Sequence, residues 1–127
     1  MKILVIDDDL LIRCTLARIL ESCGHEVATA ADGLRGMAAF RSAPPDLVIT
    51  DILMPEQEGI ETIRQMRRER PHTKIVAISG GGQPHGFDIL TMARRLGADD
   101  VIAKPFGAEE LLGSVGRLAP AGGEAAA

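Results

Sequence analysis

The stretch Pro45–Pro55, PDLVITDILMP, contains a short apolar strand that ends at a carboxylate. Its apolar part, Leu47–Ile49, is uninterrupted, which is typical of a strand buried on both faces of a parallel sheet. Ile3–Ile6 near the start of the chain has the same character and is followed by the acidic run Asp7–Asp9. Ile3–Ile6 is the first predicted strand and Leu47–Ile49 is the third. The first and third strands are neighbours in most doubly wound sheets, so the carboxylates that follow these two strands are predicted to meet at one edge.

Short apolar runs alternate with helical patterns along the rest of the chain, and further strands are expected at residues 25–30, 74–78 and 101–103. Helices are expected where apolar residues recur at helical spacing. The five patterns are Ile12 to Cys23; a stripe of Leu34, Met37, Ala38 and Arg41; Ile60, Ile63 and Met66; Ile89, Ala93 and Leu96; and Leu111, Val115 and Leu118. Five alternating pairs predict an α/β fold, a single doubly wound domain whose parallel sheet carries helices on both faces.

Composition bounds the class of protein. The 127 residues, 46% of them hydrophobic, suit one folded domain. A net charge of −4 and 2% aromatic residues argue against a nucleic-acid surface. No apolar run approaches the ~20 residues of a membrane span, and no signal peptide precedes the first strand, so no membrane insertion is expected. Cys14 and Cys23 lie too far apart on one predicted helix for a disulfide, so we expect reduced thiols in a cytoplasmic protein.

The residues that directly follow the strands carry the chemistry, because ligands of such sheets bind beyond the carboxyl ends of the strands. The carboxylates of Asp7–Asp9 repel one another unless a cation lies among them, and Asp51 adds a fourth carboxylate at the same edge. Oxygen ligands without histidine or cysteine suit a hard cation, Mg²⁺ rather than a transition metal. Asp9 has a simpler role, because aspartate is a favoured cap for the first helix.

Two further polar residues follow the fourth and fifth strands. Lys104 can hold a phosphoryl oxygen as a compact positive charge. A lone lysine is more often an ordinary surface residue, but this one lies opposite four aspartates. Ser79 can donate its hydroxyl to the same oxygen or satisfy a backbone group in a turn, and the sequence leaves both roles open. Gly80–Gly82 lacks the phosphate-loop pattern and is interpreted as a flexible loop.

Together these motifs resemble the receiver domain of two-component response regulators. The resemblance rests on residues 3–8 (ILVIDD), residues 45–55, Ser79 and residues 104–106 (KPF), and it covers the chain from Met1 to Leu118. It implies a flavodoxin-like, five-stranded parallel sheet in the order 2-1-3-4-5. It also implies a phosphoacceptor switch that catalyses only its own phosphorylation and dephosphorylation, and is not an enzyme in the ordinary sense.

The resemblance assigns a role to each matching position. Asp51 matches the phosphoacceptor, and the metal ligands that the resemblance implies for Mg²⁺ are Asp7, Asp8, Asp51 and the backbone carbonyl of Leu53. Ser79 and Lys104 match the residues that contact the phosphoryl group and report it. The bond between Lys104 and Pro105 is expected to be cis.

The resemblance also implies the partners. A sensor histidine kinase or a histidine phosphotransfer protein would donate the phosphoryl group. The surface formed by the fourth helix, fifth strand and fifth helix would contact a downstream protein or a fused output domain, without direct nucleic-acid binding, and a homodimer is a further assembly that the family allows. The receiver is expected to span residues 1–119, with residues 120–127 as a flexible Ala/Gly-rich tail.

Two departures from the family pattern concern the switch. Val101 stands where the family usually has tyrosine or phenylalanine, and the segment from Ser79 to Gly97 is about three residues longer than is typical. Valine is too small for the inward swing of an aromatic ring. We therefore expect the loop at Gly80–Gly82 to carry the conformational change.

Two other functions share part of this pattern. A haloacid-dehalogenase-type phosphatase would use Asp7 as its nucleophile, but the later acidic pair Asp99–Asp100 precedes Lys104, which is the wrong order, and no cap domain fits in 127 residues. A receiver-like binding module that does not use phosphate is the second alternative. Such modules generally lose Asp51 or the acidic pair, and this chain retains both.

Overall fold

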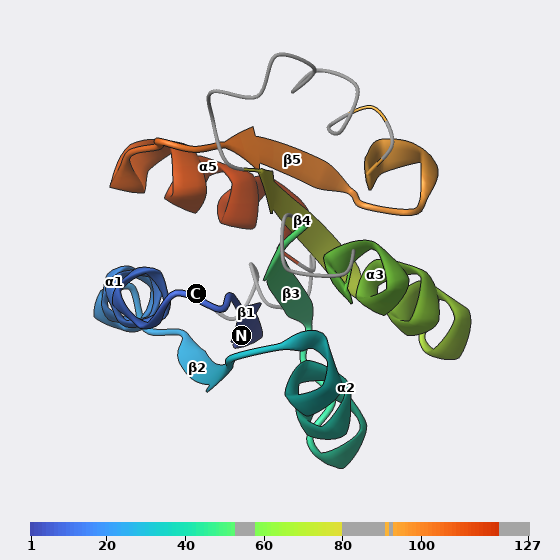
Figure 1. The fold of residues 1–127 in the computed structure, drawn as a ribbon. Coiled ribbons are helices and arrows are strands. Elements are labelled where there is room, and N and C mark those ends of the chain that lie inside the picture. Colours follow the sequence, from blue (N-terminus) through green and yellow to red (C-terminus); the bar gives the residue numbers. More distant parts are fainter. Residues whose placement is uncertain (53–57, 80–90, 92, 120–127) are drawn as a thin grey trace.

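Five parallel strands form one sheet in the order β2-β1-β3-β4-β5, which confirms the predicted doubly wound topology (Figure 1). The computed structural model describes residues 1–52, 58–79, 91 and 93–119. The strands are β1 (Lys2–Ile6), β2 (Glu26–Ala30), β3 (Leu47–Asp51), β4 (Lys74–Ser79) and β5 (Asp100–Ala103). The helices with assigned bounds are α1 (Leu10–Ser22), α2 (Gly33–Ser42), α3 (Glu58–Glu69) and α5 (Ala108–Leu118).

Helices cover both faces of the sheet: α1 and α5 lie on one face, and α2 and α3 lie on the other (Figure 1). Successive strand residues point to opposite faces. Ile3 and Val5 therefore pack with a cluster that includes Leu16 of α1 and Leu111 of α5. Leu4 packs in the opposite cluster, with residues of α2 and α3. The uninterrupted apolar runs of the sequence are thus strands with two buried faces.

The ends of α1 follow the predicted local chemistry. Asp9 caps the helix, because its Oδ1 accepts hydrogen bonds from the backbone N–H groups of Leu11 (2.9 Å) and Ile12 (3.4 Å). Gly24 follows the helix with a φ of 90°, a conformation that glycine adopts without a steric penalty. The cap therefore confirms the role predicted for Asp9.

The stripe predicted for α2 is confirmed at Met37 and wrong at its other three members. The helix buries Gly33, Gly36, Met37 and Phe40, whereas Leu34 is 80% exposed. Ala38 and Arg41, two further members of the predicted stripe, are exposed as well. Gly36 explains the difference, because a Cβ there would lie 2.9 Å from Cγ1 of Ile6 in β1. The bare backbone lets this face approach the sheet, a contact that hydrophobicity alone does not reveal.

Two sequence predictions concern the segment between β4 and β5. The loop at Gly80–Gly82 and the first residue of the fourth predicted helix, Ile89, lie outside the described residues. Ala93 is buried against the α2 and α3 face, and Gly97 has a φ of 118°. Glycine adopts this φ without a steric penalty.

Candidate functional site

The carboxyl ends of the strands bring the predicted site residues to one edge of the sheet. Asp7 directly follows β1, Asp51 ends β3, Ser79 ends β4 and Lys104 directly follows β5. The register places Asp51 beside Ile78 and Ser79 beside Ala103. Residues that are separated by up to 97 positions in the sequence thus become neighbours.

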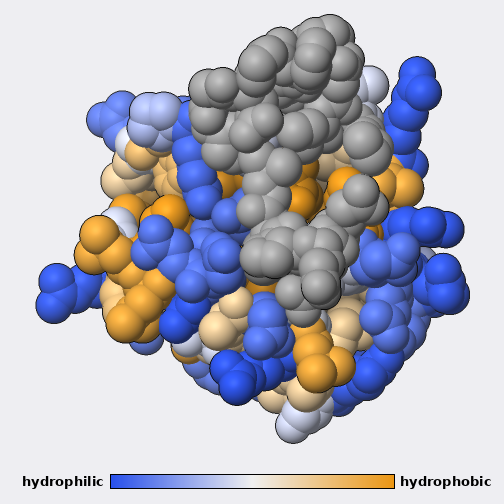
Figure 2. Space-filling model, viewed as in Figure 1, coloured by the Kyte–Doolittle hydropathy of each residue, from blue (hydrophilic) through white to orange (hydrophobic). Residues whose placement is uncertain are grey.

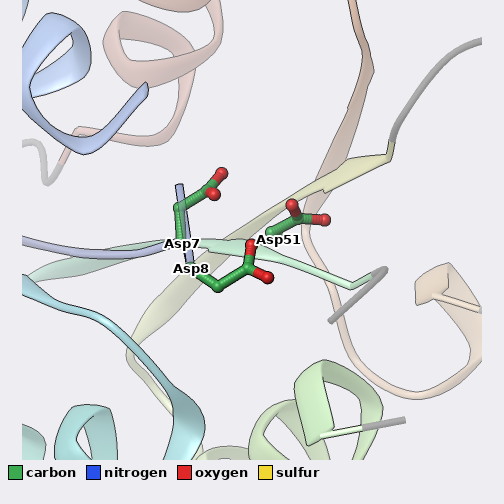
Figure 3. Close-up of side chains that lie close together, drawn as sticks. All are labelled: Asp7, Asp8 and Asp51. Carbon is green, nitrogen blue, oxygen red and sulfur yellow. The ribbon is translucent and has the colours of Figure 1, made fainter. Parts of the chain in front are cut away.

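Three carboxylates form the centre of this edge. Each of Asp7, Asp8 and Asp51 offers an oxygen that lies within 4.8 Å of the others (Figure 3). Asp7 is 1% exposed and Asp51 is 5% exposed, while Asp8 is open to solvent. Such a set of oxygen donors, buried on one side and open on the other, fits a hard divalent cation that keeps several of its waters.

Lys104 supplies the positive charge of the cluster. Its Nζ donates to Oδ2 of Asp51 at 2.9 Å and to Oδ2 of Asp7 at 3.2 Å. Burial opposes the charged form of the lysine, but these two carboxylates outweigh it and raise its pKa. Burial, together with the nearby Asp51 charge, raises the pKa of Asp7 despite the hydrogen bond from Asp9 and the charge of Lys104. The cluster therefore sets two buried carboxyl groups against a single lysine.

Backbone contacts fix the loop that carries Asp7. The Asp7 N–H donates to the carbonyl of Ala30 at 3.2 Å, and Oδ1 accepts from the Asp9 N–H at 2.9 Å. The Asp7 carbonyl accepts from Nη1 of Arg13 at 2.7 Å. No sequence pattern singles out Arg13, because it is one of eleven arginines and lies outside the strand ends.

The fourth and fifth strands place the remaining predicted residues around this cluster. Ser79 is buried at the end of β4, and its carbonyl accepts from the Lys104 N–H at 2.7 Å. The Lys104–Pro105 peptide bond is cis, as predicted. Val101 is partly buried and packs against the core on the α2 and α3 face. Leu53 lies outside the described residues, so its carbonyl ligand stays a prediction.

A glycine that the sequence did not single out lies against the backbone of Asp51. Gly59 is buried at the start of α3, where a Cβ would meet the Asp51 carbonyl oxygen and would lie 2.6 Å from Cα of Ile52. A helix whose first turn touches the end of β3 this closely has room for no side chain at that position. Gly59 thus sets how near α3 comes to the candidate phosphoacceptor.

Fold and site together define a class: doubly wound α/β proteins with a carboxylate cluster and a lysine at the carboxyl edge of the sheet. Comparison with known families makes this specific, because the sequence model of the response regulator receiver domain matches residues 3–116. The chain therefore belongs to the response regulator receiver domain family of two-component systems. Members of this family are phosphoacceptor switches rather than classical enzymes, and they generally bind Mg²⁺.

Individual relatives agree with this assignment. The chain is 32% identical over 120 residues to the chemotaxis protein CheY of Listeria monocytogenes, covering 94% of this chain and 98% of that protein. It is 38% identical over 110 residues to a probable transcriptional regulator, ycf27, of Cyanophora paradoxa. Among solved structures, the receiver domain of NtrX from Brucella abortus superposes with a TM-score of 0.85 at 36% identity, covering 91% of this chain and 96% of that one.

Several relatives are longer than this chain. The match covers 87% of this chain but 44% of the ycf27 protein, and 92% of this chain but 26% of a longer NtrX chain. The shared part is the receiver domain in each case. In the part of the chain that the structure describes, no helix is long and apolar enough to cross a membrane.

Proposed function

We propose that this receiver accepts a phosphoryl group on Asp51 from a phosphohistidine of a sensor kinase or a histidine phosphotransfer protein. The observation that carries the proposal is the contact of the Lys104 ammonium with Asp51, 2.9 Å away, inside a cluster whose third and fourth members are Asp7 and Asp8. A nucleophilic carboxylate beside one fixed cation and two further metal-type carboxylates is the equipment that phosphoryl transfer needs.

The transfer is a displacement at phosphorus. A carboxylate oxygen of Asp51 attacks, the new P–O bond forms, and the P–N bond to the donor histidine breaks. Its electron pair leaves with the imidazole nitrogen, which takes up a proton. During the transfer Lys104 holds one equatorial oxygen of the phosphoryl group, and the positive charge of the lysine offsets the negative charge that develops there in the transition state.

The acidic cluster is proposed as the Mg²⁺ site, with Asp7, Asp8, Asp51 and the Leu53 carbonyl as the protein ligands. When bound, Mg²⁺ supplies a Lewis acid that neutralises charge on the phosphoryl oxygens. Lys104 has a second task before transfer, because it partly balances the carboxylates while no cation is present. Hydrolysis resets the switch: a water oxygen attacks phosphorus, the acyl phosphate P–O bond breaks, and inorganic phosphate leaves.

The output is a population shift at the surface formed by the fourth helix, β5 and α5, which would contact a downstream protein or a fused output domain. Ser79 and Lys104 would report the phosphoryl group to it. With Val101 in place of an aromatic residue, the change would pass mainly through the segment that follows Ser79. We assign the receiver to residues 1–119; the tail expected at residues 120–127 lies outside the described residues. The exposed free thiols of Cys14 and Cys23 support a cytoplasmic location.

Acetyl phosphate tests the proposal without a known kinase. Incubation with Mg²⁺ should add the mass of one phosphoryl group to the intact protein, and Asp51→Asn or EDTA should abolish the addition. Asp9→Asn is a matched control, because it removes a charge from the same acidic run while asparagine still caps α1. It should be phosphorylated like the wild type.

Two results would contradict the proposal. Modification that persists in Asp51→Asn would place the acceptor elsewhere. Mg²⁺ binding without phosphorylation by any small donor would favour a binding module that does not use phosphate. The haloacid-dehalogenase alternative predicts the reverse mutational pattern, with turnover lost in Asp7→Asn and kept in Asp51→Asn; the family match to receiver domains argues against it.

A further inference from the structure

Arg13 lies on the first turns of α1 and reaches back to the loop that carries the acidic residues. Its Nη1 donates to the carbonyl oxygen of Asp7 at 2.7 Å, and the side chain is partly buried. This contact lies behind the carboxylate cluster, because it engages the backbone of Asp7 and leaves both carboxylate oxygens to other donors. Arg13 therefore touches neither the proposed phosphoacceptor nor any carboxylate of the cluster through a described hydrogen bond.

The contact completes the hydrogen bonding of Asp7. The N–H donates to Ala30, Oδ1 accepts from Asp9, Oδ2 accepts from Lys104 and the carbonyl accepts from Arg13. The last of these holds the peptide plane between Asp7 and the next residue, because that carbonyl belongs to the plane. A charge-assisted hydrogen bond of this length is roughly twice as strong as a neutral one.

Asp8 depends on that plane for its direction. Among the described residues, no hydrogen bond or ion pair holds its carboxylate, and the side chain is exposed. The backbone therefore sets the direction of its Cα–Cβ bond, and with it the region that the carboxylate can reach. A rotation of the Asp7–Asp8 peptide would turn the Asp8 carboxylate away from Asp51, with which it converges in Figure 3.

We propose that Arg13 is a positioning residue for the metal site: by fixing the Asp7 carbonyl it holds the Asp8 carboxylate where a divalent cation can bind. The inference rests on the proposed function, in which the cluster binds Mg²⁺. Positioning and charge have opposite effects here. A guanidinium near a cation site repels the cation, so loss of the charge alone would tighten Mg²⁺ binding, whereas loss of the orientation weakens it.

The test is a Mg²⁺ titration of the wild type, Arg13→Ala and Arg18→Ala, followed by amide chemical shifts because the chain has no tryptophan. Arg18→Ala is the matched control, since it removes the same charge from an exposed position of the same helix. Loss of a residue that orients a metal ligand typically weakens affinity 10–100-fold. We expect Arg13→Ala to bind Mg²⁺ about tenfold more weakly, and Arg18→Ala to bind like the wild type.

A second readout needs no metal. In the metal-free protein the Asp8 amide resonance should move in Arg13→Ala and stay in place in Arg18→Ala. Equal or tighter Mg²⁺ binding by Arg13→Ala, or an unmoved Asp8 amide, would overturn the inference. Arg13→Met, which keeps the apolar stem of the side chain, gives the same comparison if the alanine variant does not fold. Absence of Mg²⁺ binding by the wild type would instead refute the proposed function.

Discussion

Gly59→Ala tests whether the close approach of α3 to the end of β3 sets the position of Asp51. The added Cβ would lie 2.6 Å from Cα of Ile52 and would also meet the carbonyl oxygen of Asp51. An ordinary carbon–carbon contact is about 3.5–4.0 Å, so the two backbone segments must separate by about 1 Å. Both obstacles are backbone atoms, which cannot rotate away as a side chain can.

The energetic consequence combines two opposing effects. Forcing extra volume into a packed site costs about 1–3 kcal/mol, and alanine recovers up to about 1 kcal/mol through its better helix propensity. We expect a net loss of stability of about 1–2 kcal/mol. Displacement by about 1 Å should also slow phosphorylation by acetyl phosphate about a hundredfold, because transfer depends on the alignment of the attacking oxygen.

Gly116→Ala is the matched control, because a Cβ there meets nothing within 4 Å and the position is exposed in α5. It should gain about 0.5–1 kcal/mol from helix propensity and keep its phosphorylation rate. Urea unfolding followed by far-ultraviolet circular dichroism gives the stabilities, and intact mass against time gives the rates for the folded variants. If Gly59→Ala unfolds and reacts like the wild type, α3 does not constrain Asp51 and the reasoning is refuted.

Three further outcomes follow from the charges. In the folded protein the pKa of Asp7 is raised above 3.8, so the stability of the metal-free protein should fall as the pH rises from 3.8 through the folded-state pKa. Asp7→Asn lacks this titration, so its urea midpoint should rise relative to that of the wild type over the same pH range. A constant difference between the two midpoints would contradict this. Burial raises the pKa of Asp100, but hydrogen bonds from Ser114 and Arg117 outweigh it and lower that pKa. Asp100→Ala should therefore cost about 2 kcal/mol near neutral pH, and the gap should shrink as the pH falls below 3.8 through the folded pKa; the lack of a gap at neutral pH would show that these contacts are unimportant. Mg²⁺ at one hundred times its Kd should stabilise the wild type by about 2.7 kcal/mol in thermal or urea unfolding, and an equal gain in Asp51→Asn would place the cation elsewhere.

Hydrophobic patches on the face drawn in Figure 2 lie over α1 and α2, with hydrophilic residues between them. Among the described residues, the large hydrophobic side chains that stay exposed are Leu10 and Leu11 of α1 and Leu34 of α2, at 64%, 74% and 80%. All three lie in the first turn of their helices, at the end of the sheet that carries the acidic cluster. The end of the sheet that carries the acidic cluster therefore also carries exposed apolar side chains.

Much of the site could be predicted from the sequence, because the alternation of apolar runs and helical patterns in a parallel α/β chain also indicates where each strand ends. The carboxylates of Asp7 and Asp51 and the ammonium of Lys104 directly follow or end apolar runs, and parallel strands bring their carboxyl ends to one edge. Residue type then limits the chemistry to a hard cation and phosphate. The cap at Asp9 and the turn at Gly24 are equally local, since each depends on hydrogen bonds or dihedral angles within a few residues.

What only the tertiary structure decided depends on backbone approach. Hydrophobicity placed Leu34 on the buried stripe of α2, yet the helix turns Gly36 to the sheet because contact with Ile6 requires a bare backbone. Gly59 beside the Asp51 backbone and Arg13 at the Asp7 carbonyl could not be predicted from the sequence for a different reason. Their partners are backbone atoms, which every residue carries, so no pattern of side chains marks them. The sequence by itself determined which side chains meet at the edge of the sheet, whereas the packing of helices on strands determined which backbone groups hold them there.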